Sequence, residues 1–173
     1  MAELSGHGFA VRVPAGWEAE IYRRAPDAAP PDLASLDVAS LDGAALGAAD
    51  SAGLHYPPIV HLTTIALPPE RGDFGGGALG ALTSRDVFIS LFEYERRDSA
   101  NALFAHDGPP WPLSADDFDP SALRVALPGQ TGCQRFFRHR GRAFALYVVL
   151  GSHSLRRLTL PAVNDALAAI EIA

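Results

Sequence analysis

The segment from Asp86 to Glu95 constrains the fold more than any other part of the sequence. Two sets of apolar side chains alternate along it: Val87, Ile89 and Leu91 on one face, and Phe88, Phe92 and Tyr94 on the other. Alternation with a period of two is typical of a β-strand, and a strand that is apolar on both faces must be covered on both. The segment is therefore predicted to be a central strand of a sheet with further layers on each side.

The rest of the chain supplies partners for this strand. Apolar residues that alternate or are β-branched predict further strands at 9–13, 17–22, 59–67, 122–127, 133–139 and 143–150. Helical spacing predicts a short helix at 98–106 and a second at 161–170, with Pro161 and Asp165 near its N-terminal end. We therefore expect the α+β class, an antiparallel β-sheet flanked by helices, in a single domain over residues 1–173.

Two turn sequences indicate hairpins. Residues 14–16, with the sequence PAG, are expected to join strands 9–13 and 17–22 into an N-terminal hairpin. Arg140 and Gly141 are expected to join strands 133–139 and 143–150 in the same way.

Residues 25–53 differ in composition from the rest of the chain. They contain five aspartates, no basic residue and no aromatic residue, and they are rich in Ala, Pro and Ser. Such a segment buries too little apolar surface to offset its ordering entropy, so an acidic, loosely packed insertion is predicted. The alternative is a set of short helical turns lined by leucines, which are Leu33, Leu36, Leu41 and Leu46.

The charge distribution limits the classes of partner. The net charge is −6, with −11 in residues 1–120 and +5 in residues 121–173. A protein that coats nucleic acid needs positive charge, so nucleic acid is not expected as a partner. The chain has 14 arginines and no lysine, which together with the content of Ala, Gly and Pro indicates a GC-rich bacterial genome.

The cysteine count and the apolar runs limit the cellular compartments in which the protein is expected. Cys133 is the only cysteine, which excludes an internal disulfide and a zinc site made of several cysteines. The first residues lack the basic start and apolar run of a secretory signal, and the most apolar stretch, 143–150, is far below the ~20 residues of a membrane span. The protein is therefore expected in the cytoplasm, with no membrane partner.

Both ends of the chain carry short family motifs. Residues 8–14, with the sequence GFAVRVP, are followed by Trp17, and residues 163–170 read VNDALAAI. These two ends resemble those of PsbP-like domains, a group that includes the photosystem extrinsic subunit and Ran-binding import factors. The whole chain is also similar to proteins of high-GC bacteria. The resemblance implies an α/β/α sandwich and binding without catalysis, and it transfers no functional residue.

Arginines gather near the predicted turn at Arg140. Arg138, Arg140 and Arg142 would cluster at the hairpin tip, where guanidinium groups can pair with carboxylates or phosphates. Three interpretations remain open: a solvated hairpin end, a contact with an acidic protein surface, and a contact with nucleic acid.

Two aromatic residues in loops are further candidates for binding. Trp111 lies in the sequence PPWP, which holds a large aromatic side chain in a rigid turn, and Phe74 lies in the Gly-rich loop. Rigid aromatic side chains are good anchors at protein interfaces. The alternative for Trp111 is a plug over the core.

A different class of function would use the loop from Gly72 to Gly80. A small enzyme or ligand carrier would hold a pocket beneath this loop, lined by His61, Asp73 and His106. Nucleotide and metal sites are not expected there, because the chain has no lysine, no phosphate-binding glycine motif and no paired ligand spacing.

Cys133 shares a predicted strand face with Arg135 and His139, which leaves open an activated thiol. The alternative is a half-buried structural thiol. No arrangement of side chains has the spacing that catalysis needs, so no catalytic residue, cofactor or metal is predicted. The sequence favours a non-catalytic protein-binding or assembly module that recognises another protein or a second copy of itself.

Overall fold

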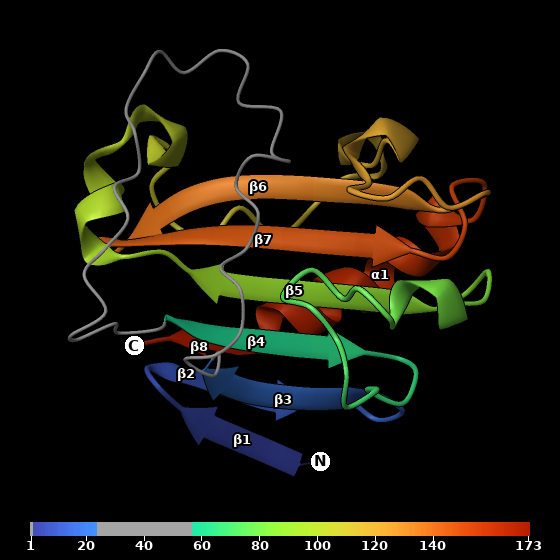
Figure 1. Ribbon diagram of the computed structural model, residues 1–173, viewed down its shortest axis with the longest axis horizontal. Coiled ribbons are helices and arrows are strands. Elements are labelled where there is room, and N and C mark those ends of the chain that lie inside the picture. The colour runs from blue at the N-terminus through green and yellow to red at the C-terminus, as the bar shows by residue number, and fades with distance from the viewer. Residues whose placement is uncertain (1, 24–56) are drawn as a thin grey trace.

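The structure is a computed structural model that describes residues 2–23 and 57–173. The larger of its two antiparallel sheets has five strands, in the order β3 (Glu18–Arg23), β4 (Pro58–Thr63), β5 (Val87–Glu93), β7 (Arg142–Leu150) and β6 (Thr131–His139) (Figure 1). The smaller sheet has the order β1 (Ala2–Gly6), β2 (Phe9–Val13) and β8 (Ile170–Ile172). The described residues form one α-helix, α1 (Arg156–Ala168). This architecture confirms the α+β class.

β5 is a central strand, as its sequence predicts. It pairs with β4 on one side and with β7 on the other. Val87, Ile89 and Leu91 face the main core, and Phe88 faces a second cluster on the opposite side of the sheet. All four side chains are fully buried. Burial on both faces explains why residues 87–92 are apolar at every position except Ser90.

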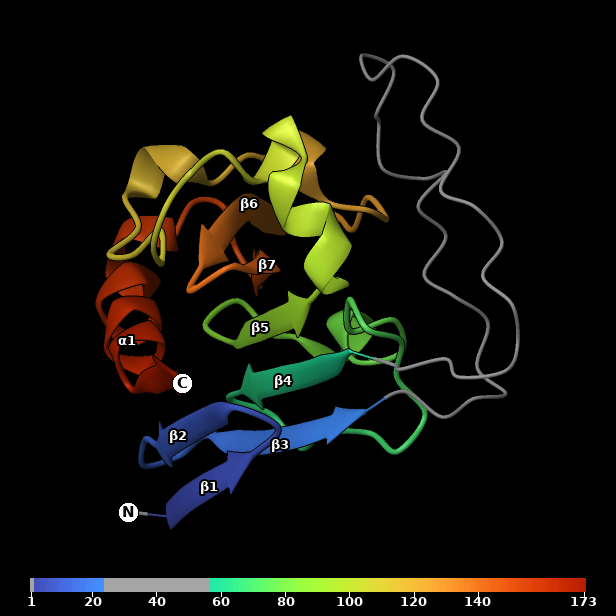
Figure 2. The ribbon, with the colours of Figure 1, turned by 90° about the vertical axis from the view of Figure 1, so that its left-hand side faces the viewer.

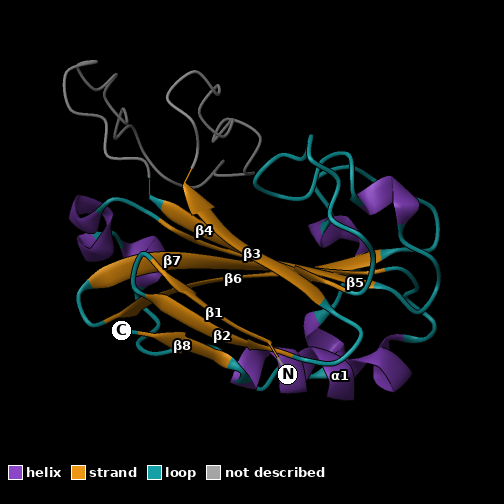
Figure 3. Cartoon of the chain, turned by 90° about the horizontal axis from the view of Figure 1, so that it is seen from below, coloured by secondary structure: helices purple, strands orange, loops and turns teal. Residues whose placement is uncertain are grey.

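The two faces of the large sheet are covered differently. The smaller sheet, α1 and the loop with the 3₁₀ turn at Ala115–Asp117 lie on one face, and loops with other short 3₁₀ turns lie on the opposite face (Figures 2 and 3). The main core lies between the large sheet, β2, β8 and α1. In the described residues an α-helix therefore covers one face of the sheet, whereas the sequence led us to expect helices around the sheet.

The expected N-terminal hairpin is wrong in its pairing. The chain does turn at 14–16, where the Trp17 amide donates to the Pro14 carbonyl at 3.2 Å. However, β2 pairs with β1 and β8 in the smaller sheet, whereas β3 pairs with β4 in the larger one. Both strands place alternate side chains in the same core, so the periodicity that predicts the strands does not distinguish one pairing from the other.

Four other elements differ from their predictions. The strand expected at 59–67 ends at Thr63, and loop follows it. Residues 122–127 are not a strand but follow a 3₁₀ turn at Pro120–Ala122, and residues 98–106 contain 3₁₀ turns in place of a helix. The C-terminal helix begins at Arg156, so Pro161 lies inside it and Asp165 lies near its C-terminal end. Pro161 is tolerated on the exposed side of the helix, where water can bind the carbonyl that its ring leaves without a donor.

The C-terminal hairpin is as predicted. β6 and β7 pair along their whole length, and Arg140 and Gly141 form the turn with φ values of 51° and 73°. The expected acidic insertion at 25–53 lies outside the described residues.

Candidate functional site

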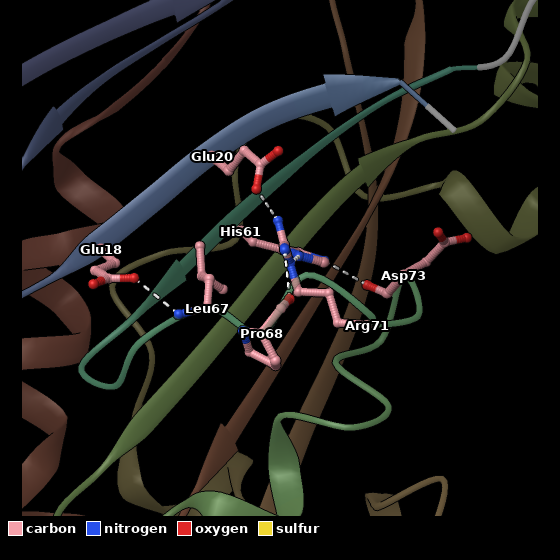
Figure 4. Close-up of polar contacts among 7 residues, drawn as sticks. All are labelled: Glu18, Glu20, His61, Leu67, Pro68, Arg71 and Asp73. Carbon is pink, nitrogen blue, oxygen red and sulfur yellow. Dashed lines mark hydrogen bonds and ion pairs between the residues drawn. The ribbon is translucent and has the colours of Figure 1, made fainter. Parts of the chain in front are cut away.

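His61 is the centre of a polar network on the face of the large sheet that is turned away from the main core. It lies in β4 with no exposed surface. Its Nδ1 accepts a hydrogen bond from Arg71 Nε at 2.9 Å, which places the ring proton on Nε2. Nε2 in turn donates to the main-chain oxygen of Asp73 at 2.9 Å. Both ring nitrogens are therefore occupied by groups of this chain (Figure 4).

Arg71 connects this histidine to the edge strand β3. Its Nη2 forms an ion pair with the carboxylate of Glu20, and its Nη1 donates to the Pro68 carbonyl at 2.8 Å (Figure 4). Only 7% of its side chain is exposed. Glu18, two residues before Glu20, accepts a hydrogen bond from the Leu67 amide at 2.8 Å. Two carboxylates of β3 thus hold the segment that leads into the Gly-rich loop.

The environment of His61 favours the neutral imidazole. Burial, and secondarily the charge of Arg71, lower the pKa of His61 from 6.5 to about 3. The ring also packs edge-on against Tyr22 and Phe88, with centroid distances of 5.2 and 4.9 Å. An inaccessible, neutral ring with both nitrogens bonded positions the loop and is not a proton acceptor for a substrate.

The Gly-rich loop packs closely on the sheet. The Phe74 ring lies between Phe92 and Tyr147, at centroid distances of 4.8 and 5.5 Å, and the Arg124 guanidinium lies 3.7 Å from its centroid. A Cβ atom added at Gly75 would lie 2.6 Å from the Phe88 ring, so the main chain approaches the sheet where only glycine fits. Phe74 is therefore a half-buried packing residue, and aromatic side chains fill the space beneath the loop.

The residues expected to line a pocket beneath the loop are only partly brought together. His61 contacts Asp73, but through the main-chain oxygen and not the carboxylate. His106 is exposed beside β6, where its carbonyl accepts from the Arg138 amide at 2.8 Å. Among residues 2–23 and 57–173, no three His, Cys, Asp or Glu side chains form a group that could hold a metal ion.

The three arginines of the hairpin tip occupy different environments. Arg138 and Arg140 are exposed. The Arg142 guanidinium instead holds both carboxylate oxygens of Glu93, at 2.9 and 2.8 Å, and only 13% of its side chain is exposed. It also donates to the main-chain oxygen of Ala173 at 2.8 Å and lies 5.5 Å from the Phe9 ring centroid. Arg142 therefore joins the two sheets, whereas Arg138 and Arg140 remain at the surface.

Trp111 packs against the main core. Its ring meets Phe137 edge-on at a centroid distance of 5.8 Å, and the side chain is half-buried. The loop that carries it is held to α1 by Asn164, whose side-chain amide exchanges two hydrogen bonds with the main chain of Leu113, at 2.8 and 3.0 Å. This geometry matches the alternative that the sequence left open, a plug over the core.

Cys133 shares a strand face with Arg135, as its position predicts, but its thiol is not activated. The side chain is fully buried in the main core. Burial raises its pKa to about 11, with Arg135 opposing the shift and Asp117 adding to it. Arg135 forms an ion pair with Asp117. A buried thiol with a raised pKa is protonated at neutral pH and is a poor nucleophile.

The structure adds two groups of residues that the sequence analysis missed. One is the pair Glu20 and Arg71, which has no local signal because 51 residues separate the partners. The other consists of His7, Arg96 and Arg97, which lie at the same end of the sheet as Arg138 and Arg140. A signal existed for His7: it precedes Gly8 in the same way that Arg140 precedes Gly141, and such pairs mark tight turns.

Comparison with protein-family models, with curated proteins and with solved structures finds no match to this chain. In the part of the chain that the structure describes, no helix is long and apolar enough to cross a membrane.

Proposed function

We propose that the protein is a non-catalytic protein-binding or assembly module that uses the exposed tip of the β6–β7 hairpin. The observation that carries the proposal is the contrast between two sets of side chains. Arg138 and Arg140 extend into solvent, whereas His61 and Cys133 are buried and held by the fold. Exposed charge on a rigid hairpin can recognise a partner, and the two buried groups are poorly suited to chemistry.

The resemblance to PsbP-like domains supports the same class of function. We keep the PsbP-like α/β/α sandwich as part of the proposal, because the resemblance at 8–17 and 163–170 implies a binding domain. The smaller sheet and α1 on one face of an antiparallel sheet are compatible with a layered domain of this kind. The cytoplasmic location also stays a prediction.

The alternative, a small enzyme or ligand carrier, has less support. Its pocket would lie where Phe74 packs against Phe92 and Tyr147. Its imidazole would be that of His61, whose two nitrogens are engaged.

Capture of partners from the native host tests the proposal. Tagged wild-type protein is compared with the variant Arg138→Gln/Arg140→Asn and with Arg157→Gln, an exposed arginine on α1. We expect mass spectrometry to identify a protein, or the untagged chain itself, that the tip variant loses and the α1 variant retains. A partner held equally by all three proteins contradicts the use of the tip, and turnover of a small molecule that His61→Gln abolishes in folded protein contradicts the class.

A further inference from the structure

Two hairpin tips of this fold place a basic residue in an unfavourable backbone conformation. His7 has φ 54° and Arg140 has φ 51°, and each precedes a glycine that also has positive φ. In the described residues these are the only non-glycine residues with positive φ. Asn and Gly are the usual residues there, and other side chains add strain of about 1 kcal/mol or more. Strain retained at exposed basic residues suggests a use for the side chains.

The two tips lie side by side. A Cβ atom added at Gly8 would lie 3.0 Å from Nη1 of Arg142, the residue that begins β7 after the Arg140–Gly141 turn. The Ala173 amide donates to the Gly8 carbonyl at 3.0 Å, and Arg142 binds the Ala173 oxygen. Both turns therefore belong to one end of the molecule, the left-hand edge in Figure 1.

Two further arginines reach the same end from β5. The Tyr94 amide donates to the Ala143 carbonyl at 2.8 Å, so the chain leaves β5 beside the start of β7. Arg96 and Arg97 follow at once, and both are exposed. Arg138 lies across from Ala143 on β6. We call this surface the basic end of the sheet, and it consists of His7, Arg96, Arg97, Arg138 and Arg140.

Only part of the charge at the basic end is paired. Arg97 meets Glu95 at 2.9 Å, and Arg138 meets Asp107 at 3.7 Å. Within the described residues, Arg96 and Arg140 have no carboxylate within 4.0 Å. Among residues 2–23 and 57–173, these two guanidinium groups of the basic end therefore lack a carboxylate partner, one just after β5 and the other in the β6–β7 turn.

We infer that the basic end binds an acidic segment of a protein partner, with carboxylates on Arg96 and Arg140. This inference rests on the proposed function and names the chemistry of the partner. Arg96 follows β5 and Arg140 follows β6, and these strands are two strand spacings, about 10 Å, apart, so one short extended segment can reach both guanidinium groups. Glu95 and Asp107 interrupt the positive surface and repel a continuous phosphate backbone, so a peptide fits better than nucleic acid.

Fluorescence anisotropy with a labelled peptide of alternating glutamate and serine tests the inference. The variant Arg96→Gln/Arg140→Asn is compared with Arg85→Gln/Arg157→Gln, which makes the same change in net charge at exposed sites away from the basic end. We expect the first variant to lose about tenfold in affinity and to show a weaker dependence on salt. The matched control keeps the wild-type affinity.

Arg140→Asn separates a binding role from a structural one. Asn is favoured at positive φ, so the variant should unfold at the same temperature as wild type or higher, while it binds the peptide more weakly. Equal losses in the two double variants, or no loss in either, overturn the inference. A single-stranded oligonucleotide of equal length that binds more tightly than the peptide overturns the assigned partner class.

The two proposals fail in different ways. If the peptide does not bind but the captured partner still depends on Arg138 and Arg140, the inference is overturned and the proposed function stands. If the captured partner is also indifferent to the tip, both are overturned.

Discussion

At the scale of single residues, this protein places groups with catalytic potential where they stabilise the fold. His61 accepts from Arg71 and donates to a main-chain oxygen, and it does so only as the neutral tautomer. Protonation would place a second cation beside the Arg71 guanidinium inside the protein and would remove the acceptor at Nδ1. The histidine is therefore a source of acid sensitivity in a buried network.

The stability of the protein should fall as the pH falls below about 6.5 because of His61. Its pKa is about 3 in the folded protein and 6.5 when free, so the unfolded chain binds the proton first. The free energy of unfolding should be flat above about pH 7 and lower by about 2 kcal/mol at about pH 5. Urea denaturation across this range checks the slope. The variant His61→Gln should flatten the slope, and parallel profiles for the two proteins would contradict this assignment.

At the scale of elements, the segment between β4 and β5 packs on the large sheet and covers part of one face. Ser90 of β5 donates its hydroxyl to the Asp73 oxygen at 2.5 Å, the same oxygen that His61 binds. Phe74 then inserts among the aromatic side chains of the sheet. Hydrogen bonds and ring packing together fix a glycine-rich segment that its composition alone would leave flexible.

Gly75→Ala should destabilise the protein, whereas Gly80→Ala should not. Gly75 has φ 79° and no room for a Cβ beside the Phe88 ring. Gly80 has nothing within 4 Å of an added Cβ. We expect a loss of about 2 kcal/mol or more for the first variant and a change of less than about 1 kcal/mol for the second. Equal midpoints in chemical denaturation would show that the loop is not held as described.

Local sequence predicts the strands well and their partners poorly. The alternation in β5 and the Arg140–Gly141 turn are sufficient to predict a central strand and the C-terminal hairpin. The polar strand β1 has Leu4 as its one large apolar residue, and β8 has only three residues, so neither has a clear periodic signal. Their pairing with β2 depends on how the N- and C-terminal regions fold together, which a local pattern does not encode.

The candidate site shows the same limit. Exposure of Arg138 and Arg140 follows from their place at a hairpin tip, and their roles can be proposed from sequence. Arg142 lies only two residues further on, but its partner Glu93 is 49 residues away. Sequence spacing alone therefore predicts three equivalent arginines. The long-range pair with Glu93 instead buries most of the Arg142 side chain.

At the scale of the whole molecule, Arg142 is the main polar link between the two sheets. It joins Glu93 of β5 to the chain beyond β8, and its guanidinium lies near the rings of Phe9 and Phe144. The hydrogen bonds that Arg142 donates to the Glu93 carboxylate raise the pKa of Arg142, so its guanidinium stays charged. Most of the remaining contact between the sheets is apolar.

Removal of either Arg142 or Glu93 should destabilise the contact between the two sheets. Arg142→Gln and Glu93→Gln each leave one charge largely buried without its partner, which should cost about 2 kcal/mol in unfolding free energy. The double variant should lose less than the sum of the two, and a double-mutant cycle by urea denaturation measures the difference. Strict additivity would mean that the two side chains do not act together.

Because Cys133 is buried, the reactivity of its thiol can report how often the folded protein opens. It is the only cysteine in the sequence, and its side chain is fully buried in the main core. A disulfide reagent at about pH 8 should leave the native protein unmodified and label it fully in denaturant. The labelling rate then reports how often the interior becomes accessible. An engineered surface cysteine could accordingly be tagged with a dye without first replacing the native one.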